Sequence, residues 1–317
     1  MSTTAARISP ASDRPHEHAL KIAEYATEAW FNAHGSADPA IPLSVLAALS
    51  LINPPHGARH SIATELITLG ADEFADSIRR IWTVFVRTRP DLLNPVYPLL
   101  EPWFDHDRPM SPENLRAAKH VADRVLGIDL LGLTGTENRH DVDLLGLVLT
   151  LLRPKSALQG RGQYYTPSDV ADILSRLSGP ALMADLTSND TSAGSEIHDP
   201  ACGTGGLLRA TAESLRRRGA NLADYEWYGN DIDALAIAGF AVNAVLWGLG
   251  YKVVLGVADS LTEPDWTRKA NRMRQETIDL AVDAKRSTRV LDAVRDIERL
   301  LADDVADTDM PRARHEG

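Results

Sequence analysis

The stretch HDPACGTGG at 198–206 places an acid, three glycines and the chain's single cysteine within nine positions. Asp199 is expected to end a strand, after which Gly203, Gly205 and Gly206 turn the chain into a helix. Glycines in such a turn can adopt positive φ and let the backbone approach a ligand, and the start of the helix offers free N–H groups. The alternative is an ordinary strand-to-helix turn in a domain that binds no cofactor.

Two further acids follow strand-like segments in the same way. Asp231 closes the segment YEWYGND, and Asp259 closes YKVVLGVAD. Either one alone is more often a helix N-cap than a ligand. Three acids at the carboxyl ends of three successive parallel strands, however, meet at the crevice where open α/β sheets bind ligands.

The elements that position these acids divide the chain into segments. Residues 1–16 are expected to be a disordered leader, and 17–152 a helical domain of five or six helices, because apolar residues recur at three- and four-residue spacing. Ser111 and Pro112 have the types expected at an N-cap and the first helical position. Over 153–266, short strands alternate with helices and predict a parallel sheet. A helical segment, 267–303, and a disordered tail, 304–317, complete the chain.

Composition narrows the classes of function. The net charge of −11 weighs against DNA binding by this chain alone, since an acidic protein needs a local basic face or a basic partner. The single cysteine excludes an internal disulfide framework. The N-terminus lacks the apolar segment of a secretory signal, and the apolar run at 234–249 is too short and too broken to span a membrane. A cytoplasmic protein is the simplest interpretation.

Two sequence elements carry a family resemblance. GRGQYYTPSDVADIL at 160–174 is followed, about thirty residues after its Thr-Pro, by DPACGTGGLL at 199–208. The pair resembles the N6-adenine DNA methyltransferases, especially the modification subunits of type I restriction–modification systems, whose pattern is G-Q-[FY]-[FY]-T-P and then D-P-[AT]-C-G-[ST]-G-G. DVDLLGLVLTLL at 141–152 resembles the helix that leads into the first element, and the resemblance covers roughly 141–262.

The resemblance implies a fold and a cofactor. The fold is α/β, with a Rossmann-like sheet of the class I S-adenosylmethionine-dependent methyltransferases, here truncated after strand 3 and preceded by an all-helical N-terminal domain. The cofactor is S-adenosylmethionine, and no metal is implied. Asp231 would accept both ribose hydroxyls and Asp259 the adenine amino group, which suits carboxylates because they are acceptors only. The implied cofactor-binding set, in which the first three residues hold the methionine end, is Tyr165, Thr166, Pro167, Asp199, Pro200, Ala201, Gly203, Gly205, Asp231, Ile232, Asp259 and Ser260.

The element that would hold the target adenine is missing from its usual place. The family carries [NDS]-P-P-[FYW] at the end of its fourth strand, but the segment after Asp259 has no such motif, and Ile278–Leu301 fits a helical period. Asn53-Pro54-Pro55-His56 spells the first three residues, so Asn53 is a catalytic candidate if the motif order is permuted. A helix ended by Asn-Pro is the alternative interpretation.

Because the sheet is expected to lack its fourth strand, the first strand should have an unpaired edge. Open edges pair or aggregate unless something covers them, so the C-terminal helical segment or another chain is expected to cover this one. Basic residues close to the third strand, Arg268, Lys269 and Arg272, are the best DNA-contact candidates in the sequence, although such clusters are more often solvated faces.

Three functions remain open at this point. The first is a DNA adenine-N6 methyltransferase that works with a specificity partner, because no segment resembles a target-recognition domain. The second is a non-catalytic subunit that binds S-adenosylmethionine and acts only with a partner chain. The third is methylation of another substrate, such as RNA or protein.

Overall fold

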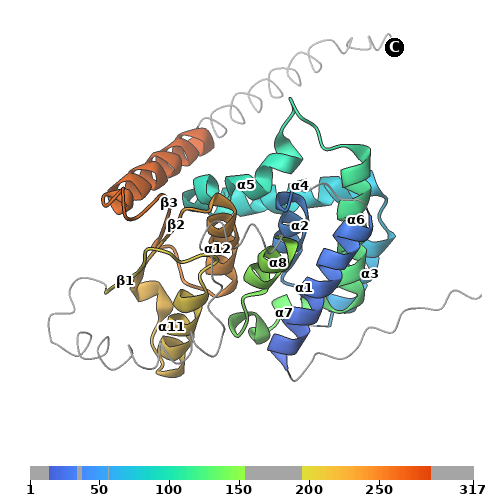
Figure 1. Ribbon diagram of the computed structural model, residues 1–317, viewed down its shortest axis with the longest axis horizontal. Helices are drawn as coiled ribbons and strands as arrows, with labels where there is room; N and C mark the ends of the chain where they lie inside the picture. The colour runs from blue at the N-terminus through green and yellow to red at the C-terminus, as the bar shows by residue number, and fades with distance from the viewer. Residues whose placement is uncertain (1–13, 34–37, 56, 154–194, 287–317) are drawn as a thin grey trace, which may run out of the picture.

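The computed structural model describes residues 14–33, 38–55, 57–153 and 195–286. Within these residues, a helical region that ends at residue 153 packs against a three-stranded sheet with its own helices (Figure 1). The order of elements, helices first and strand–helix alternation afterwards, agrees with the mixed α/β class expected from the sequence.

The helical region contains more helices than the periodicity predicted. Eight α-helices and two 3-10 helices are described, where five or six helices were expected. Two were missed for local reasons: one carries Pro98 and Pro102 inside it, which normally mark a helix end, and another is five residues long, too short to show a period. The elements are α1 (Pro15–Asn32), α2 (Ala40–Ser50), α3 (Arg59–Thr68), α4 (Ala71–Thr88), η1 (Pro90–Leu92), α5 (Leu93–Phe104), α6 (Pro112–Gly127), α7 (Leu130–Thr134), η2 (Glu137–His140) and α8 (Leu144–Leu152).

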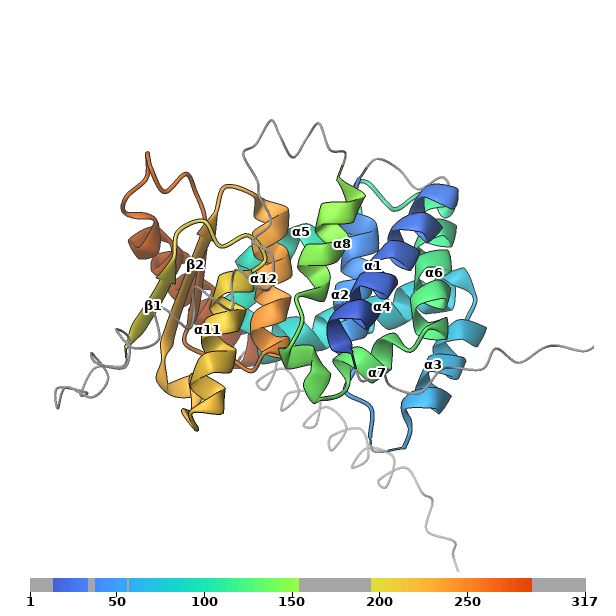
Figure 2. The same ribbon diagram turned by 60° about the horizontal axis from the view of Figure 1, so that its bottom comes forward.

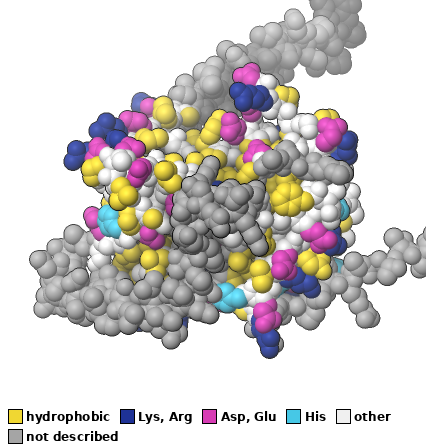
Figure 3. All heavy atoms as spheres, viewed as in Figure 1, with side chains coloured by type: hydrophobic (Ala, Val, Ile, Leu, Met, Phe, Trp, Pro, Cys, Tyr) yellow, Lys and Arg dark blue, Asp and Glu magenta, His cyan; other side chains and the backbone are white. Residues whose placement is uncertain are grey.

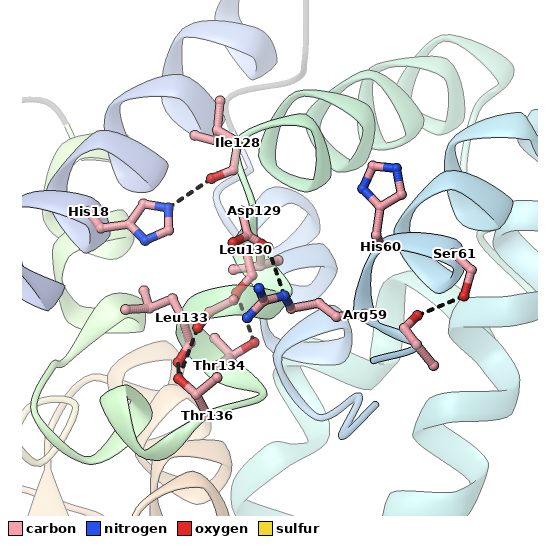
Figure 4. Close-up of polar contacts among 12 residues, drawn as sticks. His18, Arg59, His60, Ser61, Ile128, Asp129, Leu130, Leu133, Thr134 and Thr136 are labelled. Atoms are coloured by element: carbon pink, nitrogen blue, oxygen red, sulfur yellow. Dashed lines mark hydrogen bonds and ion pairs between the residues drawn. The ribbon is translucent and has the colours of Figure 1, made fainter. Parts of the chain in front are cut away.

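A polar cluster lies at the junction of α1, α3 and α7 (Figure 4). Asp129, the N-cap of α7, is buried and adopts a left-handed φ of 65°. Its Oδ1 lies 3.4 Å from Nε of Arg59, and Nε2 of His18 lies 2.7 Å from the Ile128 carbonyl oxygen. These contacts connect helices within the helical region.

The sheet has the order β1-β2-β3, and all its pairings are parallel. The strands are β1 (Glu196–Asp199), β2 (Glu226–Asp231) and β3 (Val253–Val257), connected by α11 (Gly206–Arg217), η3 (Leu222–Asp224) and α12 (Ala234–Leu246). In the register, Asp199 pairs with Gly229, and Asp231 pairs with Val257. The strands expected from the sequence are confirmed, and their carboxyl ends lie at one edge.

Helix α12 lies between the sheet and the helical region (Figure 2). Apart from Asn243 its residues are apolar, and ten of its thirteen residues are buried, as expected for a helix enclosed in a core. Its packing partners include α5 and α8 on one side and β2 and β3 on the other. One hydrophobic core therefore runs through both regions, so the boundary expected near residue 152 divides the sequence without dividing the core. Among the described helices, none combines the length and the apolarity that crossing a membrane would need.

The residues after β3 form a helix over 266–286. Trp266 and Ala270 pack on Tyr228 and Val254, so this helix covers one face of β2 and β3. Within the described residues, β1 pairs only with β2. The described part of the C-terminal helical segment packs on β2 and β3; residues 287–303 of that segment lie outside the described residues, so the expected cover of the β1 edge stays a prediction.

Candidate functional site

The turn after β1, residues 200–206, has the conformation that its glycines allow. Gly203 and Gly205 have φ values of 55° and 92°, and Gly205 is the N-cap of α11. A Cβ at Gly205 would lie 2.5 Å from Cδ2 of Phe240, so only glycine fits there. A Cβ at Gly203 would meet no atom of the described residues within 4 Å. We call residues 200–206 the glycine turn. It is tightly packed at Gly205, and no described residue fills the space beside Gly203.

Asp199 and Asp231 meet at this turn. Oδ2 of Asp231 accepts a hydrogen bond from the N–H of Gly203 at 2.8 Å, and its Oδ1 accepts from the N–H of Asp233 at 2.9 Å. Oδ1 of Asp199 accepts from the N–H of Ala201 at 3.1 Å. Burial raises the pKa of Asp199, the Ala201 hydrogen bond opposes the rise, and the nearby charge of Asp231 adds to it. Each of these oxygens has a further lone pair, so the pair can still accept hydrogen bonds and favours a positively charged ligand.

Asn230 joins the three strand ends, and the sequence prediction missed it. Its Nδ2 donates to the carbonyl oxygens of Pro200 at 3.2 Å and Ala258 at 2.8 Å. The Asn230 carbonyl accepts from the N–H of Cys202 at 2.8 Å. The side chain is fully buried, and within the described part of the chain its Oδ1 has no hydrogen-bond partner. The available signal was a polar residue inside a buried strand, which costs stability unless it is hydrogen-bonded.

Asp259 lies two residues beyond β3 and begins a turn. Its Oδ1 accepts from the N–H of Leu261 at 3.0 Å, and its carbonyl accepts from the N–H groups of Thr262 and Glu263. Asp259 and Ser260 are both partly exposed. The Ala258 N–H donates to the Asp231 carbonyl at 3.2 Å, which connects this turn to the end of β2. Asp259 thus lies at the carboxyl ends of the strands, as expected. Its carboxylate accepts one hydrogen bond within the turn and is partly open to solvent.

Large apolar side chains are exposed at these strand ends. Ile232 is 63% exposed, Val257 51% and Leu261 92%. A groove of about 690 Å³ adjoins Ile232 and Asp233 and is lined on its other side by residues around α5 and the start of α6, among them Pro98. Exposed apolar groups next to carboxylates suit a ligand that has an apolar part and polar substituents.

Cys202, within the glycine turn, is buried. Burial raises the pKa of its thiol well above the usual value, and the negative charges of Asp199 and Asp231 act in the same direction. A nucleophilic cysteine needs a lowered pKa. Cys202 is therefore a packing residue of the turn.

The sequence prediction also named one segment outside the described residues and one candidate in the helical region. Tyr165, Thr166 and Pro167 lie outside the described residues. Asn53 is described: it is exposed, follows the end of α2, and belongs to no strand. A Cβ at Gly135 would lie 2.8 Å from Pro54, so this segment packs near α7. The position of Asn53 agrees with the interpretation of a helix that ends at Asn-Pro.

The expected DNA contacts, Arg268, Lys269 and Arg272, are exposed on the helix over 266–286. Lys269 is already paired, since its Nζ lies 2.7 Å from a carboxylate oxygen of Glu263 and 3.6 Å from one of Asp265. On the face in Figure 3, basic and acidic side chains are interspersed. Phosphate binding favours a concentrated basic surface, and the described side chains on this face do not form one.

The chemistry of the site follows from its donors and acceptors. Two carboxylates near each other, the glycine turn and exposed apolar side chains can hold a small polar molecule with hydroxyl, amino or cationic groups. Among the described residues, no group of three or more His, Cys, Asp or Glu side chains could hold a metal ion.

Comparison with known proteins places this site in context. Residues 146–283 match the family model described as N-6 DNA Methylase. The type II methyltransferase M.MamI of Microbacterium ammoniaphilum is 36% identical over 117 residues, which are 34% of this chain and 31% of that protein. The type I restriction enzyme MpnII methylase subunit of Mycoplasma pneumoniae is 26% identical over 115 residues, 36% of this chain and 19% of that protein. The matches thus span about a third and about a fifth of the lengths of these relatives.

Proposed function

We propose that this chain, which belongs to the N-6 DNA methylase family through residues 146–283, binds S-adenosylmethionine at the ends of β1, β2 and β3. We further propose that it serves methyl transfer from that cofactor to N6 of adenine in DNA. The cofactor supplies an electrophilic methyl group on a sulfonium when it is bound.

The observation that carries the proposal is the meeting of Asp199, Asp231 and the glycine turn at one sheet edge. S-adenosylmethionine offers a positive sulfur, an ammonium group, two ribose hydroxyls and an adenine amino group. Carboxylates attract the positive groups and accept hydrogen bonds from the rest. We assign the ribose hydroxyls to Asp231 and the adenine amino group to Asp259, and Ile232 offers an apolar face for the ring.

The other half of the reaction needs a residue set for the target base. An enzyme that methylates a base in DNA must take that base out of the stack and bind it by stacking and polar contacts. Asn-Pro-Pro occurs once in the sequence, at 53–55, and Asn53 lies at a helix end. We therefore propose that a partner supplies part of the DNA contact and the sequence specificity. The MpnII relative, by its name, is likewise one subunit of a type I enzyme.

Calorimetry with S-adenosylmethionine tests the binding site. Asp231→Ala should weaken binding at least about a hundredfold, since it removes a charged acceptor and a support of the turn. Asp76→Ala is the control, because Asp76 is an exposed acid on α4 that pairs only locally with Arg79. If the wild type does not bind, or if Asp231→Ala binds like the wild type, the assignment of the site is wrong.

A second candidate function is a cofactor-binding subunit without catalysis of its own. It is favoured by one observation: the described chain after β3 continues as a helix over 266–286, and none of the described strands ends in the base-binding motif. Methyl-transfer assays with adenine-containing DNA, RNA and protein substrates separate the candidates. Binding without transfer supports the second. Transfer to DNA by the purified chain supports the first, and Asn53→Ala would then test whether Asn53 takes part.

A further inference from the structure

The N-cap residue of α8 makes a buried polar contact with the glycine turn. Asp143 is the N-cap of α8, and its Oδ1 accepts from the N–H of Gly146 at 2.9 Å. Its Oδ2 accepts from the hydroxyl of Thr204, in the glycine turn, at 2.6 Å. Asn243 of α12 donates through Nδ2 to Asp143 Oδ1 at 2.8 Å and to the Thr204 carbonyl at 2.9 Å. The helical region thus fixes both the side chain and the backbone of Thr204.

The Thr204 side chain is tightly enclosed between α8 and α12. It is 7% exposed. A Cβ at Gly146 would lie 2.5 Å from its Oγ1, and a Cβ at Gly239 would lie 3.1 Å from its Cγ2. Close packing on two sides and a charge-assisted hydrogen bond restrict the Thr204 side chain to one rotamer.

The other end of α8 contacts the loop after β2. Arg153, the C-cap residue, forms an ion pair with Asp233, and the two side chains are only 13% and 4% exposed. Asp233 caps α12 by accepting from the N–H of Leu235 at 3.0 Å, and its own N–H donates to Asp231 Oδ1 at 2.9 Å. The arginine therefore holds the residue that orients the carboxylate of Asp231.

We propose that α8 positions both cofactor-binding loops. Asp143 at its start holds Thr204 of the glycine turn, and Arg153 at its end holds Asp233 of the loop after β2. S-adenosylmethionine affinity then depends on contacts that no cofactor atom makes. This inference rests on the proposed function, since it concerns the same site. Asp143, Thr204 and Arg153 are positioning residues: they act through the backbone of Gly203 and the carboxylate of Asp231.

The physical reason is the population of the binding-competent loops. Without the Thr204 hydroxyl, Asp143 keeps a buried oxygen with one donor fewer, and the glycine turn loses its link to a helix 61 residues away in the sequence. The turn then samples other conformations, and the apparent affinity falls by the fraction of time spent in them.

The test compares three threonine variants by calorimetry with S-adenosylmethionine, with a melting curve for each. Thr204→Val keeps the shape and removes the hydroxyl, and it should weaken binding about tenfold. Thr204→Ser keeps the hydroxyl and should restore affinity to within about threefold of the wild type. Thr211→Val is the matched control, because the Thr211 hydroxyl donates within its own helix, to the Leu207 carbonyl at 3.0 Å. A Thr204→Val protein that binds like the wild type would overturn the inference.

Arg153→Gln tests the other end of α8 and keeps the proposal open to refutation if Thr204→Val does not fold. It should weaken binding by several-fold at a temperature where the variant is fully folded. Affinity unchanged in Arg153→Gln contradicts the role of that end. If the wild type itself does not bind, the proposed function fails; if the wild type binds and the variants bind equally well, only the role of α8 fails.

Discussion

The tetrapeptide Asp-Leu-Leu-Gly occurs twice in this chain, at 129–132 and at 143–146, and each copy begins a short helix. The backbones differ at the first residue. Asp129 has a left-handed φ of 65°, which non-glycine residues adopt at a cost, whereas Asp143 has a φ of −105°. The same local sequence therefore does not dictate one local structure.

The two aspartates also differ in what they contact. Asp129 pairs with Arg59 inside the helical region, and its Oδ2 has no hydrogen-bond partner within the described residues (Figure 4). Asp143 accepts from Thr204 and Asn243, both beyond residue 153. The first aspartate stabilises one region, and the second joins two regions. The predictions below change matched positions in the two copies.

The glycines of the two copies should give the largest effects, about 3 kcal/mol each at the upper end of the range for overpacking, because the added Cβ would lie so close to a carboxylate oxygen. A Cβ at Gly132 would lie 2.0 Å from Asp129 Oδ2, and one at Gly146 would lie 2.3 Å from Asp143 Oδ2. Gly132→Ala and Gly146→Ala should each destabilise the fold by about 3 kcal/mol or more, because the buried sites would be overpacked. Urea denaturation measures this. Only Gly146→Ala should also weaken S-adenosylmethionine binding; an equal loss of affinity in both would contradict the division of roles.

Two arginines should give the next largest effects: Arg153, which ends α8 and pairs with Asp233, and Arg59, which pairs with Asp129. Arg153→Gln leaves the buried Asp233 carboxylate without this partner and should cost roughly 2–3 kcal/mol. Arg59→Gln should cost about 1 kcal/mol, because Arg59 is 37% exposed and water screens its charge. Thermal unfolding measures both. The reverse order of costs would show that the ion pair within the helical region matters more than the one that reaches Asp233.

The sequence could predict the parts of the fold that depend on local pattern. The strand–helix alternation around Asp199, Asp231 and Asp259 appears in the structure as three parallel strands with their acids at one edge. The N-cap at Ser111 is also confirmed, since its Oγ accepts from the N–H of Asn114. Glycines, caps and periodicity report on neighbours in the chain, and these features need nothing else.

Features that depend on distant contacts could not be predicted in this way. Asn230 connects strand ends only because the sheet brings Pro200 and Ala258 to it. Asp143 looked like part of a helix leading into a motif, and its partners lie 61 and 100 residues away. The helix over 266–286 was expected from its period, but which face of the sheet it covers was decided by the packing of Trp266.

The pH dependence of stability should distinguish the two aspartates. Burial raises the pKa of both carboxyls above the usual value of 3.8; Arg59 opposes the rise at Asp129, and the Thr204 hydrogen bond opposes it at Asp143. A carboxyl with a raised folded-state pKa contributes stability that is fully present below its unfolded pKa and is lost as the pH rises through the folded value. Wild-type stability should therefore fall relative to Asp143→Asn as the pH rises from about 4 towards neutral.

Melting temperatures measured across that pH range test this, with Asp129→Asn as the comparison. Wild-type stability should fall less relative to Asp129→Asn than relative to Asp143→Asn, because a nearby guanidinium favours the ionised form of Asp129. If the melting temperatures of wild type and Asp143→Asn run parallel from pH 4 to 7, ionisation of Asp143 carries no such cost.

The smallest effect concerns the accessibility of Cys202, the chain's single cysteine. Its thiol is buried and its pKa is raised, so alkylation of the folded protein requires local opening of the glycine turn. Iodoacetamide at pH 8 should react at least about a hundredfold more slowly with the folded protein than with the urea-unfolded chain. Gly146→Ala should speed this reaction under folding conditions because it disturbs Asp143 and Thr204, while Gly132→Ala should leave it unchanged. Equal acceleration in both variants would mean that Cys202 becomes accessible through global unfolding, and the turn would then have no opening of its own for α8 to control.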